Sequence, residues 1–450
     1  MFTSVEFENY MSLKKLKLNI KQKNDFKKIV AIYGENGSGK SNIVSAFMNL
    51  RLSLDTLNAK KKLDEFLSSD TKNENIMNVK HYTAMYSDRS RIDRVFENTY
   101  LLGATEPMSL KYNFKIYGHF GYYKLIFKKD SSGSLYLASE ELNYLIKKSS
   151  GVIFHITSDE NQNISIKVSP QLFKNANLSN SMDDLIKRLW GKHTFLAIFQ
   201  EFAVENNEKY IIENVLNNFL KVQSKFEHLS FKTDNARGAN NFRQMLHNLI
   251  SGTVNNGNTR NKIENTSESL NKYFVPLYSD IMSLHYKTES LEDNKTKYEL
   301  YEKKRISDEI VEIPFVLESN GTKKLLNLFP LLLNAVNGDT VIIDEIDQGI
   351  HDLLIDRIIE NVKDDITGQL IFTTHDTQVM KQLDVSSLYV IQVDSSGNKR
   401  VSNISKASKS NIASNNNIQK LYLEGYFAGI PYADDVDFYD IIENLGVNHD

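Results

Sequence analysis

Hydrophobic and polar positions alternate at the start of the chain, first in FTSVEFENY and then in KKLKLNI, before residues 29–33 become continuously apolar up to Gly34. Alternation is typical of a strand with one buried face, and a short apolar run is typical of a strand buried on both faces. From Ser41 to about Leu54 the apolar residues recur with helical spacing. We therefore expect strands over residues 1–33 and a helix directly after them.

The middle of the chain changes pattern several times. Alternating segments between residues 107 and 157 (LKYNFKI, YYKLIFKK, SLYLA and GVIFHI) predict an antiparallel meander. Residues 57–98 are polar and charge-mixed, which suggests a helical or partly mobile insertion. Residues 180–275 are Asn-rich and predicted to be mostly helical, with a loop near SGTVNNGNTRN, and residues 280–317 return to charged, alternating strands.

Helical and apolar strand patterns interleave from residue 322 to residue 393. The segments are TKKLLNLFPLLLNAV, TVIIDE, GIHDLLIDRIIENV, QLIFTTH and SLYVIQVD. This alternation of strands and helices predicts a parallel sheet. The sequence shows no internal repeat and no sustained heptad pattern, so we do not expect a long coiled-coil arm.

Charge and composition narrow the class of protein. The chain has 54 basic and 57 acidic residues, a net charge of −3, which excludes a histone-like binder but permits a local basic groove. It contains no cysteine, which removes disulfides, thiolate metal sites and cysteine nucleophiles. It also lacks a signal-peptide pattern and an apolar run of about 18 residues. We therefore expect a soluble, cytoplasmic protein with no membrane partner.

The motif GENGSGKS, from Gly34 to Ser41, carries the strongest chemical signal. It fits G-x-x-x-x-G-K-[ST] and lies between an apolar strand and a helix, as a phosphate-binding loop requires. Its backbone N–H groups would surround the β- and γ-phosphates of ATP at the positive end of the helix. Lys40 would pair with phosphate oxygens, and the Ser41 hydroxyl would ligate Mg²⁺.

The segment TVIIDE, from Thr340 to Glu345, is a short apolar strand that ends in two acids, the Walker B pattern. Asp344 would hold the Mg²⁺ shell, and Glu345 would act as general base toward the attacking water. Alone, the segment fits equally well a buried strand that ends in solvated acids. Its combination with a phosphate-binding loop favours the catalytic interpretation.

Two further segments have a structural and a functional interpretation. In ESNGTKKLL, Ser319 and Gly321 begin a very apolar helix, where a hydroxyl and free N–H groups either form an anion site or simply cap a core helix. In FTTHD, His375 follows a strand and could donate to a γ-phosphate, although a single histidine at a strand end is often only structural. The position of ESNGT just upstream of TVIIDE favours its functional interpretation.

The order GENGSGKS, ESNGTKKLL, TVIIDEID, GIH and FTTHD resembles the head domain of ABC-type ATPases of the SMC, RecF and OLD kind, within the AAA class. The opening VEFENYMSLKKLKLNI is similar to their N-terminal strand pair. More narrowly, ESNGT in place of LSGGQ, the DEID–GIH junction and the late LYLEGYFAGIP resemble the ATPases of abortive-infection phage-defence systems, such as those of PARIS and of RloB-associated systems.

The resemblance implies an α/β fold: an ABC/SMC-like ATPase head split into two lobes, with mixed sheets, helices and a largely helical insertion. Gly34 and Asp344 are about 310 residues apart, so the intervening chain must leave the core and return. The implied parts are a first lobe with the P-loop (1–56), a polar insertion (57–98), the antiparallel β part of the first lobe (99–175), a helical insertion (176–279) and a second lobe (280–450).

The resemblance further implies a slow ATPase that uses ATP and Mg²⁺ at a composite site between two protomers. Nucleotide would bind to one protomer, and the signature and D-loop segments of the other would close on it. The implied nucleotide-binding residues are Asn36, Gly37, Ser38, Gly39, Lys40, Ser41 and Asn42; the signature residues are Ser319, Asn320 and Gly321; the D-loop residues are Asp347 and His351; Lys40, Glu345 and His375 are catalytic; Ser41 and Asp344 hold Mg²⁺.

The sequence departs from the ABC pattern at two points. ABC heads carry a Q-loop glutamine after the first lobe, but no glutamine occurs between Gln22 and Gln162. Another residue or water must therefore reach the metal. Met11 also stands where a basic residue usually follows the Asn–aromatic pair.

Three competing patterns are weaker. His351–Asp352 with Asp376 suggests an HD phosphohydrolase, but such metal clusters need further ligands that the sequence lacks. Asp435–Val436–Asp437 mimics the metal-binding pair of a Toprim nuclease, but too few residues follow His375 for that fold. Seven lysines between Lys14 and Lys28 could follow a phosphate backbone, although a solvated strand face is the preferred interpretation.

The preferred hypothesis is an ATPase that dimerises around nucleotide and senses infection or gates a separately encoded effector in antiviral defence. The resemblance implies as partners a second copy or a higher oligomer, a Toprim or RloB-like nuclease, and a phage protein as trigger. The alternative is an SMC/RecF-like DNA-repair ATPase that binds duplex DNA directly. A third is a nucleotide-binding scaffold with almost no turnover. The helical stretch 180–275 and the acidic tail from Pro431 to Asp450 are candidate contact regions.

Overall fold

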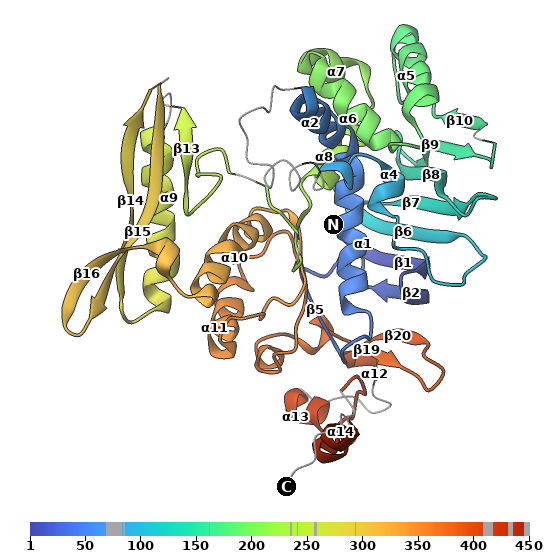
Figure 1. Ribbon diagram of the computed structural model, residues 1–450. Helices are drawn as coiled ribbons and strands as arrows, with labels where there is room; N and C mark the ends of the chain where they lie inside the picture. The colour runs from blue at the N-terminus through green and yellow to red at the C-terminus, as the bar shows by residue number, and fades with distance from the viewer. Residues whose placement is uncertain are drawn as a thin grey trace.

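The computed structural model describes residues 1–68, 83, 86–161, 163–234, 236–240, 242–255, 259–292, 294–407, 417–430 and 435–444. In this part of the chain the strands form two seven-stranded sheets, one four-stranded sheet and a short two-stranded pair. Helices lie between and beside the sheets (Figure 1). The fold is therefore mixed α/β, as expected.

One seven-stranded sheet is mainly parallel and occupies the centre of the molecule. Its strand order is β12 (Arg237–Gly238), β11 (Ser230–Lys232), β17 (Thr340–Ile343), β18 (Gln369–Thr373), β5 (Ile29–Gly34), β19 (Leu388–Val393) and β20 (Lys399–Asn403). The strands from β11 to β19 pair in parallel, and the two outer strands pair antiparallel to them. This confirms the predicted parallel sheet.

The strand β5 is buried on both faces. Ile29, Ala31 and Tyr33 pack into one hydrophobic core, and Val30 and Ile32 pack into the other. Because side chains alternate along a strand, a continuous apolar run fills both cores at once.

The second seven-stranded sheet is antiparallel and contains the predicted meander. Its order is β10 (Ile164–Val168), β9 (Ser150–Ser158), β8 (Leu135–Leu145), β7 (His119–Lys129), β6 (Met108–Ile116), β1 (Phe2–Tyr10) and β2 (Leu13–Asn19). Helix α1 (Lys40–Leu54) lies between this sheet and the central one (Figure 1). The Tyr112 hydroxyl on β6 donates to the Ala46 carbonyl of α1 at 2.7 Å. The strands β3 (Lys21–Gln22) and β4 (Asp25–Phe26) form the short pair.

Several short helices gather at one end of the antiparallel sheet (Figure 1). They are α2 (Thr56–Ser68), α4 (Ile92–Val95), α5 (Ala176–Leu189), α6 (Phe195–Glu205), α7 (Glu208–Asn214) and α8 (Asn217–Glu227). The segment expected as a polar insertion thus begins and ends with helix, while residues 69–82 and 84–85 lie outside the described residues.

The segment 176–279, expected as a helical insertion, is mostly helical but also contributes strands to two sheets. It contains α5 to α8 and α9 (Thr259–Phe274), but β11 pairs with β17 in the central sheet, and β13 (Ser251–Asn255) joins the four-stranded sheet. The three residues of β11 are too few to show alternation, which is why the sequence pattern misses this strand. Residues 256–258 of the predicted loop lie outside the described residues.

The four-stranded sheet extends away from the central sheet (Figure 1). It contains β13, β14 (Ile281–Leu291), β15 (Lys295–Ile306) and β16 (Glu309–Pro314), which confirms the strands expected over residues 280–317. Helices α9, α10 (Asn320–Val336) and α11 (Asp352–Val362) contribute to one common core with the central sheet.

Short elements connect these parts and complete the carboxy-terminal region. The 3-10 helices are η1 (Val275–Leu277), η2 (Phe315–Leu317), η3 (Gln378–Lys381) and η4 (Val385–Ser387). The last helices are α12 (Ile404–Ala407), α13 (Ile418–Leu423) and α14 (Phe438–Asn444).

A buried carboxylate joins the helices to the antiparallel sheet. Glu140 of β8 is fully buried and accepts hydrogen bonds from Trp190 Nε1 at 2.6 Å, the Phe195 backbone N–H at 2.7 Å and the Tyr123 hydroxyl at 2.8 Å. Burial raises the pKa of Glu140 to about 7, although the three donors oppose this shift. The side chain therefore binds a proton more readily in the folded than in the unfolded chain.

The Glu140→Ala variant should lower the free energy of unfolding by about 3 kcal/mol, because three buried donors lose their acceptor. Urea unfolding at pH 7 measures this loss. Since the folded pKa lies above the ordinary value of 4.5, the stability of the wild type relative to Glu140→Gln should fall as pH rises from about 4.5 to about 7, and then level off. A Glu140→Ala chain as stable as the wild type would show that this carboxylate does not hold the sheet and helices together.

Candidate functional site

The P-loop joins β5 to α1 at the carboxyl edge of the central sheet. Gly39, which precedes the first residue of α1, has a φ of 106°, a conformation that favours glycine. A Cβ on Gly34 would lie 2.8 Å from Ser38 Oγ, so the start of the loop has no room for a side chain. The predicted motif thus has the compact backbone that a phosphate-binding loop needs.

Lys40 lies inside this loop. Its side chain is buried, and Nζ donates to the Gly34 carbonyl at 2.8 Å and to the Glu35 carbonyl at 3.1 Å. Burial lowers the pKa of Lys40, while the nearby carboxylates of Glu345 and Asp344 oppose that shift. The ammonium group therefore lies close to both acids of the Walker B segment.

A cavity of about 420 Å³ opens beside the loop. It is formed by the turn between β1 and β2, the P-loop and the residue that follows Asp344. The lining residues are Met11, Ser12, Asn36, Gly37, Gly39, Lys40, Ser41, Asn42 and Glu345. The structure thus brings most of the predicted nucleotide-binding residues together with Glu345.

The two Walker B acids are held by a threonine that the sequence interpretation missed. Thr373, fully buried at the end of β18, donates through Oγ1 to Asp344 Oδ1 at 2.6 Å. The same oxygen accepts the backbone N–H of Glu345 at 2.7 Å. Glu345 has a φ of 45°, a left-handed conformation that is uncommon for this residue type. Thr373 therefore fixes a strained backbone at the candidate catalytic acid.

The D-loop residue Asp347 and His375 meet next to this acid pair. The backbone N–H of His375 donates to Asp347 Oδ2 at 3.2 Å, while the other oxygen of Asp347 is buried and has no partner in the described part of the chain. The His375 side chain is exposed. His351 is also exposed and caps α11, because its Nδ1 accepts the Leu353 N–H at 3.3 Å.

The signature segment begins α10 but does not line the cavity. Ser319 caps the helix by accepting the Thr322 N–H at 3.2 Å, and Ser319 and Asn320 are exposed. A Cβ on Gly321 would lie 2.8 Å from the Gly349 carbonyl, so this helix start packs against the D-loop of the same protomer. Within one protomer, the signature residues and the P-loop do not share the pocket.

Two more residues at the cavity escaped the sequence interpretation. Lys399 of β20 donates to the Gly37 carbonyl at 2.7 Å and to Ser12 Oγ at 2.5 Å. Asn42 Nδ2 also donates to Ser12 Oγ, at 2.7 Å. Lys399 stands in a polar hairpin without a motif, so no sequence signal marks it. Ser12 follows the Asn–aromatic pair, and that position is the only hint of its place.

The carboxy-terminal segment LYLEGYFAGIP packs onto the strand that leads to the P-loop. The Tyr422 ring centroid lies 5.6 Å from that of Tyr33, and Gln392 Nε2 donates to the Phe427 carbonyl at 2.8 Å. A Cβ on Gly429 would lie 2.9 Å from the Ile391 carbonyl. Pro431, the last residue of this segment, lies outside the described residues.

The competing metal-site patterns involve His351, Asp376 and the acidic tail. In the described residues no group of three His, Asp or Glu side chains is placed to hold a metal ion. Asp437 accepts the backbone N–H groups of Tyr439 at 2.9 Å and Asp440 at 3.2 Å. Asp434 and Asp450, two acids of the predicted tail, lie outside the described residues.

The site has the chemistry that a nucleotide phosphate with Mg²⁺ needs. Ser38 Oγ is buried and has no hydrogen-bond partner among the described residues, Lys40 supplies a fixed cation, and Ser41 is exposed at the cavity. Asp344 keeps one carboxylate oxygen outside its hydrogen bond with Thr373. Hydroxyl and carboxylate oxygens are ligands that Mg²⁺ prefers, so the residues present fit both ATP and the metal. No described helix is long and apolar enough to cross a membrane.

Comparisons with solved structures find SMC heads at low similarity. The chain is similar to an SMC head domain from Thermotoga maritima, with 14% identity, a TM-score of 0.35 and coverage of 90% of this chain and 98% of that one. It is also similar to an Smc head bound to the C-winged helix domain of ScpA, with 16% identity, a TM-score of 0.41 and coverage of 89% and 96%. No curated protein matches the chain.

A sequence family gives a more specific match. The family described as "AAA domain, putative AbiEii toxin, Type IV TA system" matches residues 123–381. The matched range contains Ser319, Asp344 and His375, while the P-loop lies before it. Because the match spans more than half of the residues, the chain belongs to this AAA-domain family.

Proposed function

We propose that the chain binds and hydrolyses ATP with Mg²⁺ at a site shared by two protomers. The observation that carries this proposal is the convergence of Lys40 and Glu345 on one cavity beside the P-loop. A phosphate-binding loop and a carboxylate at its mouth are the two parts that phosphoryl transfer to water requires.

Each part of the cavity has a distinct task in this proposal. The loop N–H groups and Lys40 hold the β- and γ-phosphates. Ser41 and Asp344 hold Mg²⁺, which neutralises phosphate charge when bound. Glu345 accepts a proton from the attacking water. His375, whose side chain is exposed and whose backbone N–H contacts Asp347, would donate to the γ-phosphate when the site closes.

The signature and D-loop residues are proposed to act on a second protomer. Ser319 and Asn320 are exposed at the start of α10, away from the cavity lining of their own protomer. The free N–H groups of a helix start favour an anion. Two copies facing each other would let each signature segment close on the nucleotide of its partner, with Asp347 and His351 at the crossing.

The chain is further proposed to gate a separately encoded effector, a Toprim or RloB-like nuclease, with a phage protein as trigger and cytoplasmic localisation. One observation supports this proposal: the match to a family described as a putative AbiEii toxin of a Type IV TA system. The alternative is a repair ATPase that binds duplex DNA itself.

The Glu345→Gln variant should keep nucleotide affinity and lose at least 90% of ATP hydrolysis, because an amide can orient water but cannot take its proton. Phosphate release measures turnover, and fluorescent-nucleotide titration measures binding. Lys40→Ala is the contrasting variant, since it should weaken binding itself. If Glu345→Gln turns over within twofold of the wild type, another group is the base.

The Thr373→Val variant should lower kcat about tenfold or more and leave KM within about threefold. It removes the hydroxyl that holds Asp344 and the Glu345 backbone but keeps the shape of the buried side chain. Thr373→Ser should restore most of the rate. Equal rates for the Val and Ser variants would show that the hydroxyl does not position the acids.

The purified chain, supplied with ATP and Mg²⁺ or Mn²⁺, should leave DNA, RNA and tRNA uncut, because the nuclease is proposed to reside in another protein. Gel analysis of end-labelled substrates measures this. Cleavage that disappears in an Asp435→Ala/Asp437→Ala double variant would place a nuclease in the chain itself and refute the effector proposal.

A further inference from the structure

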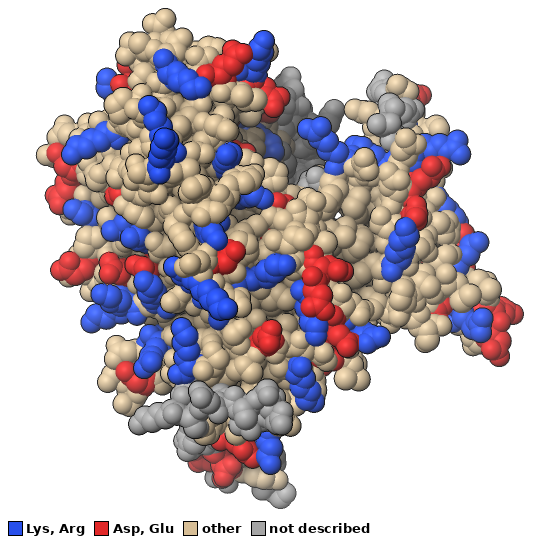
Figure 2. Space-filling model, turned by 180° about the vertical axis from the view of Figure 1, so that it is seen from behind, with Lys and Arg blue, Asp and Glu red and all other residues tan. Residues whose placement is uncertain are grey.

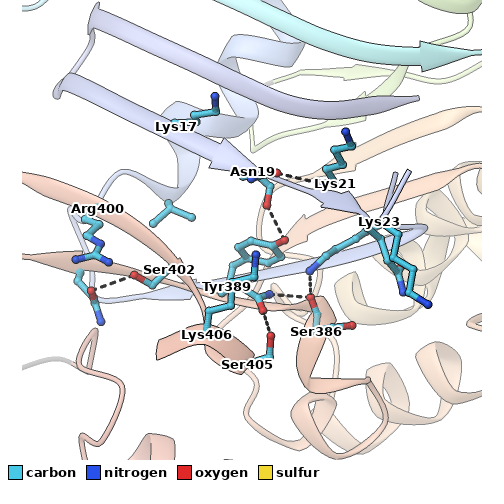
Figure 3. A pocket seen from close by; sticks show the side chains of 15 residues that line it. Lys17, Asn19, Lys21, Lys23, Ser386, Tyr389, Arg400, Ser402, Ser405 and Lys406 are labelled. Carbon is cyan, nitrogen blue, oxygen red and sulfur yellow. Dashed lines mark hydrogen bonds between the residues drawn. The ribbon is translucent and has the colours of Figure 1, made fainter. Parts of the chain in front are cut away.

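A second cavity, of about 610 Å³, lies between β2 and the β19–β20 edge of the central sheet (Figure 3). It shares no lining residue with the cavity beside the P-loop. Its walls also include β3, α12 and the turn that precedes β5. Six of its lining residues are cationic and none is acidic: Lys17, Lys21, Lys23, Lys27, Arg400 and Lys406.

This cavity differs from the surface around it in charge. On the face drawn in Figure 2, Lys and Arg side chains are mixed with Asp and Glu. Part of the lysine-rich segment 14–28 shows the same mixing of charges. Lys15 and Lys17 of β2 pair with Glu8 and Glu6 of β1. The solvated-face interpretation therefore holds for those positions of β2 but not for the lysines that follow.

Among the described residues, five of these six cations pair with no carboxylate; the exception is Lys17, which pairs with Glu6. Lys21 lies over the Phe120 ring at 4.5 Å. Within the described part of the chain, Lys23, Arg400 and Lys406 have no carboxylate within 4.0 Å, the distance of an ion pair. Figure 3 shows Arg400 and Lys406 on one wall and Lys21 and Lys23 on the other. Unpaired like charges in one concave space repel each other and favour a bound anion.

Lys27 forms the floor of the cavity and is 7% exposed. Its ammonium donates to the Ser386 carbonyl and lies 4.8 Å from the centroid of the Tyr389 ring. Burial, followed by the charge of Lys406, lowers the pKa of Lys27 to about 8. An ammonium group has three donors, so Lys27 can still donate to an anion. A bound anion would also relieve the repulsion between the charges of Lys27 and Lys406.

Size and lining select the kind of anion. A cavity of this volume is in the range of small-molecule sites, whereas a duplex needs an extended groove. The side-chain amides of Asn19 and Gln22 add neutral donors between the cations, whereas the hydroxyls of Ser402 and Ser405 already donate to Gln392 Oε1 and Asn403 Oδ1. The geometry points to a second anion site that binds a compact ligand with two or more phosphate groups. This inference does not depend on ATP hydrolysis at the P-loop.

Calorimetric titration of the full chain with inorganic tripolyphosphate tests the site directly. All chains carry Lys40→Ala, which weakens the competing P-loop. The Arg400→Glu/Lys406→Glu double variant should bind tripolyphosphate at least tenfold more weakly. The matched control is Lys187→Glu/Lys303→Glu, which makes the same charge change at exposed residues of α5 and β15 and should stay within twofold. Equal affinities of the two double variants for tripolyphosphate would overturn the site. So would the absence of tripolyphosphate binding to the chain that carries Lys40→Ala alone.

Two further arms identify the source of the phosphates. ATP that binds more tightly than tripolyphosphate indicates a nucleotide ligand, and equal binding indicates recognition of the phosphates alone; both support the inference. A 20-base-pair DNA duplex provides the contrary outcome. If it binds more tightly than tripolyphosphate and loses affinity in the Arg400→Glu/Lys406→Glu variant, the cavity is part of a nucleic-acid surface and the proposal of a compact ligand is wrong. If circular dichroism shows that the Arg400→Glu/Lys406→Glu variant does not fold, the Arg400→Gln/Lys406→Gln variant replaces it. We expect its affinity for tripolyphosphate to fall at least threefold.

Discussion

The pairing of β18 with β5 on one side and β17 on the other is the constraint on which the site depends. The two neighbours come from segments about 310 residues apart, and parallel strands place their carboxyl ends at one edge of a sheet. The P-loop, the Walker B acids and His375 therefore meet there. Gln369, fully buried in β18, reinforces the arrangement: its side chain donates to the Phe2 and Lys27 carbonyls at 2.9 Å and accepts the Phe2 N–H at 2.8 Å.

The polar contacts at this edge explain how the acids stay in place. The Thr373 hydroxyl bonds to both Walker B residues, and the β18 backbone accepts the Ile346 N–H at 3.0 Å. The left-handed backbone of Glu345 persists because these bonds compensate for its strain. The same edge carries Asp347 bonded to the His375 N–H. The end of β18 thus holds the proposed base Glu345, the proposed metal ligand Asp344 and the backbone of His375 through hydrogen bonds.

The extent to which the sequence predicts the structure depends on the distance over which each signal acts. The P-loop and Walker B segments are local patterns whose strand, turn and helix follow from a few consecutive residues, so their positions could be predicted. Thr373 and Lys399 act through neighbours distant in sequence, and nothing in their local context marks the contact. The strand β11 is too short for periodicity, and it becomes a strand only because β17 offers an unpaired edge. The basic cavity likewise arises from segments around Lys27 and Lys406 that the fold brings together.

The proposed site needs a second protomer for the signature segment to reach nucleotide, because that segment does not line the P-loop cavity of its own chain. Mixing two inactive variants tests this most directly. Ser319→Arg should abolish turnover while leaving nucleotide binding intact, and Lys40→Ala should disable the P-loop. In a mixture with demonstrated subunit exchange, each heterodimer should regain one working site, and ATP turnover should rise with a maximum near equal amounts. Turnover that stays at background over all mixing ratios would contradict a shared site and place the whole reaction within one chain.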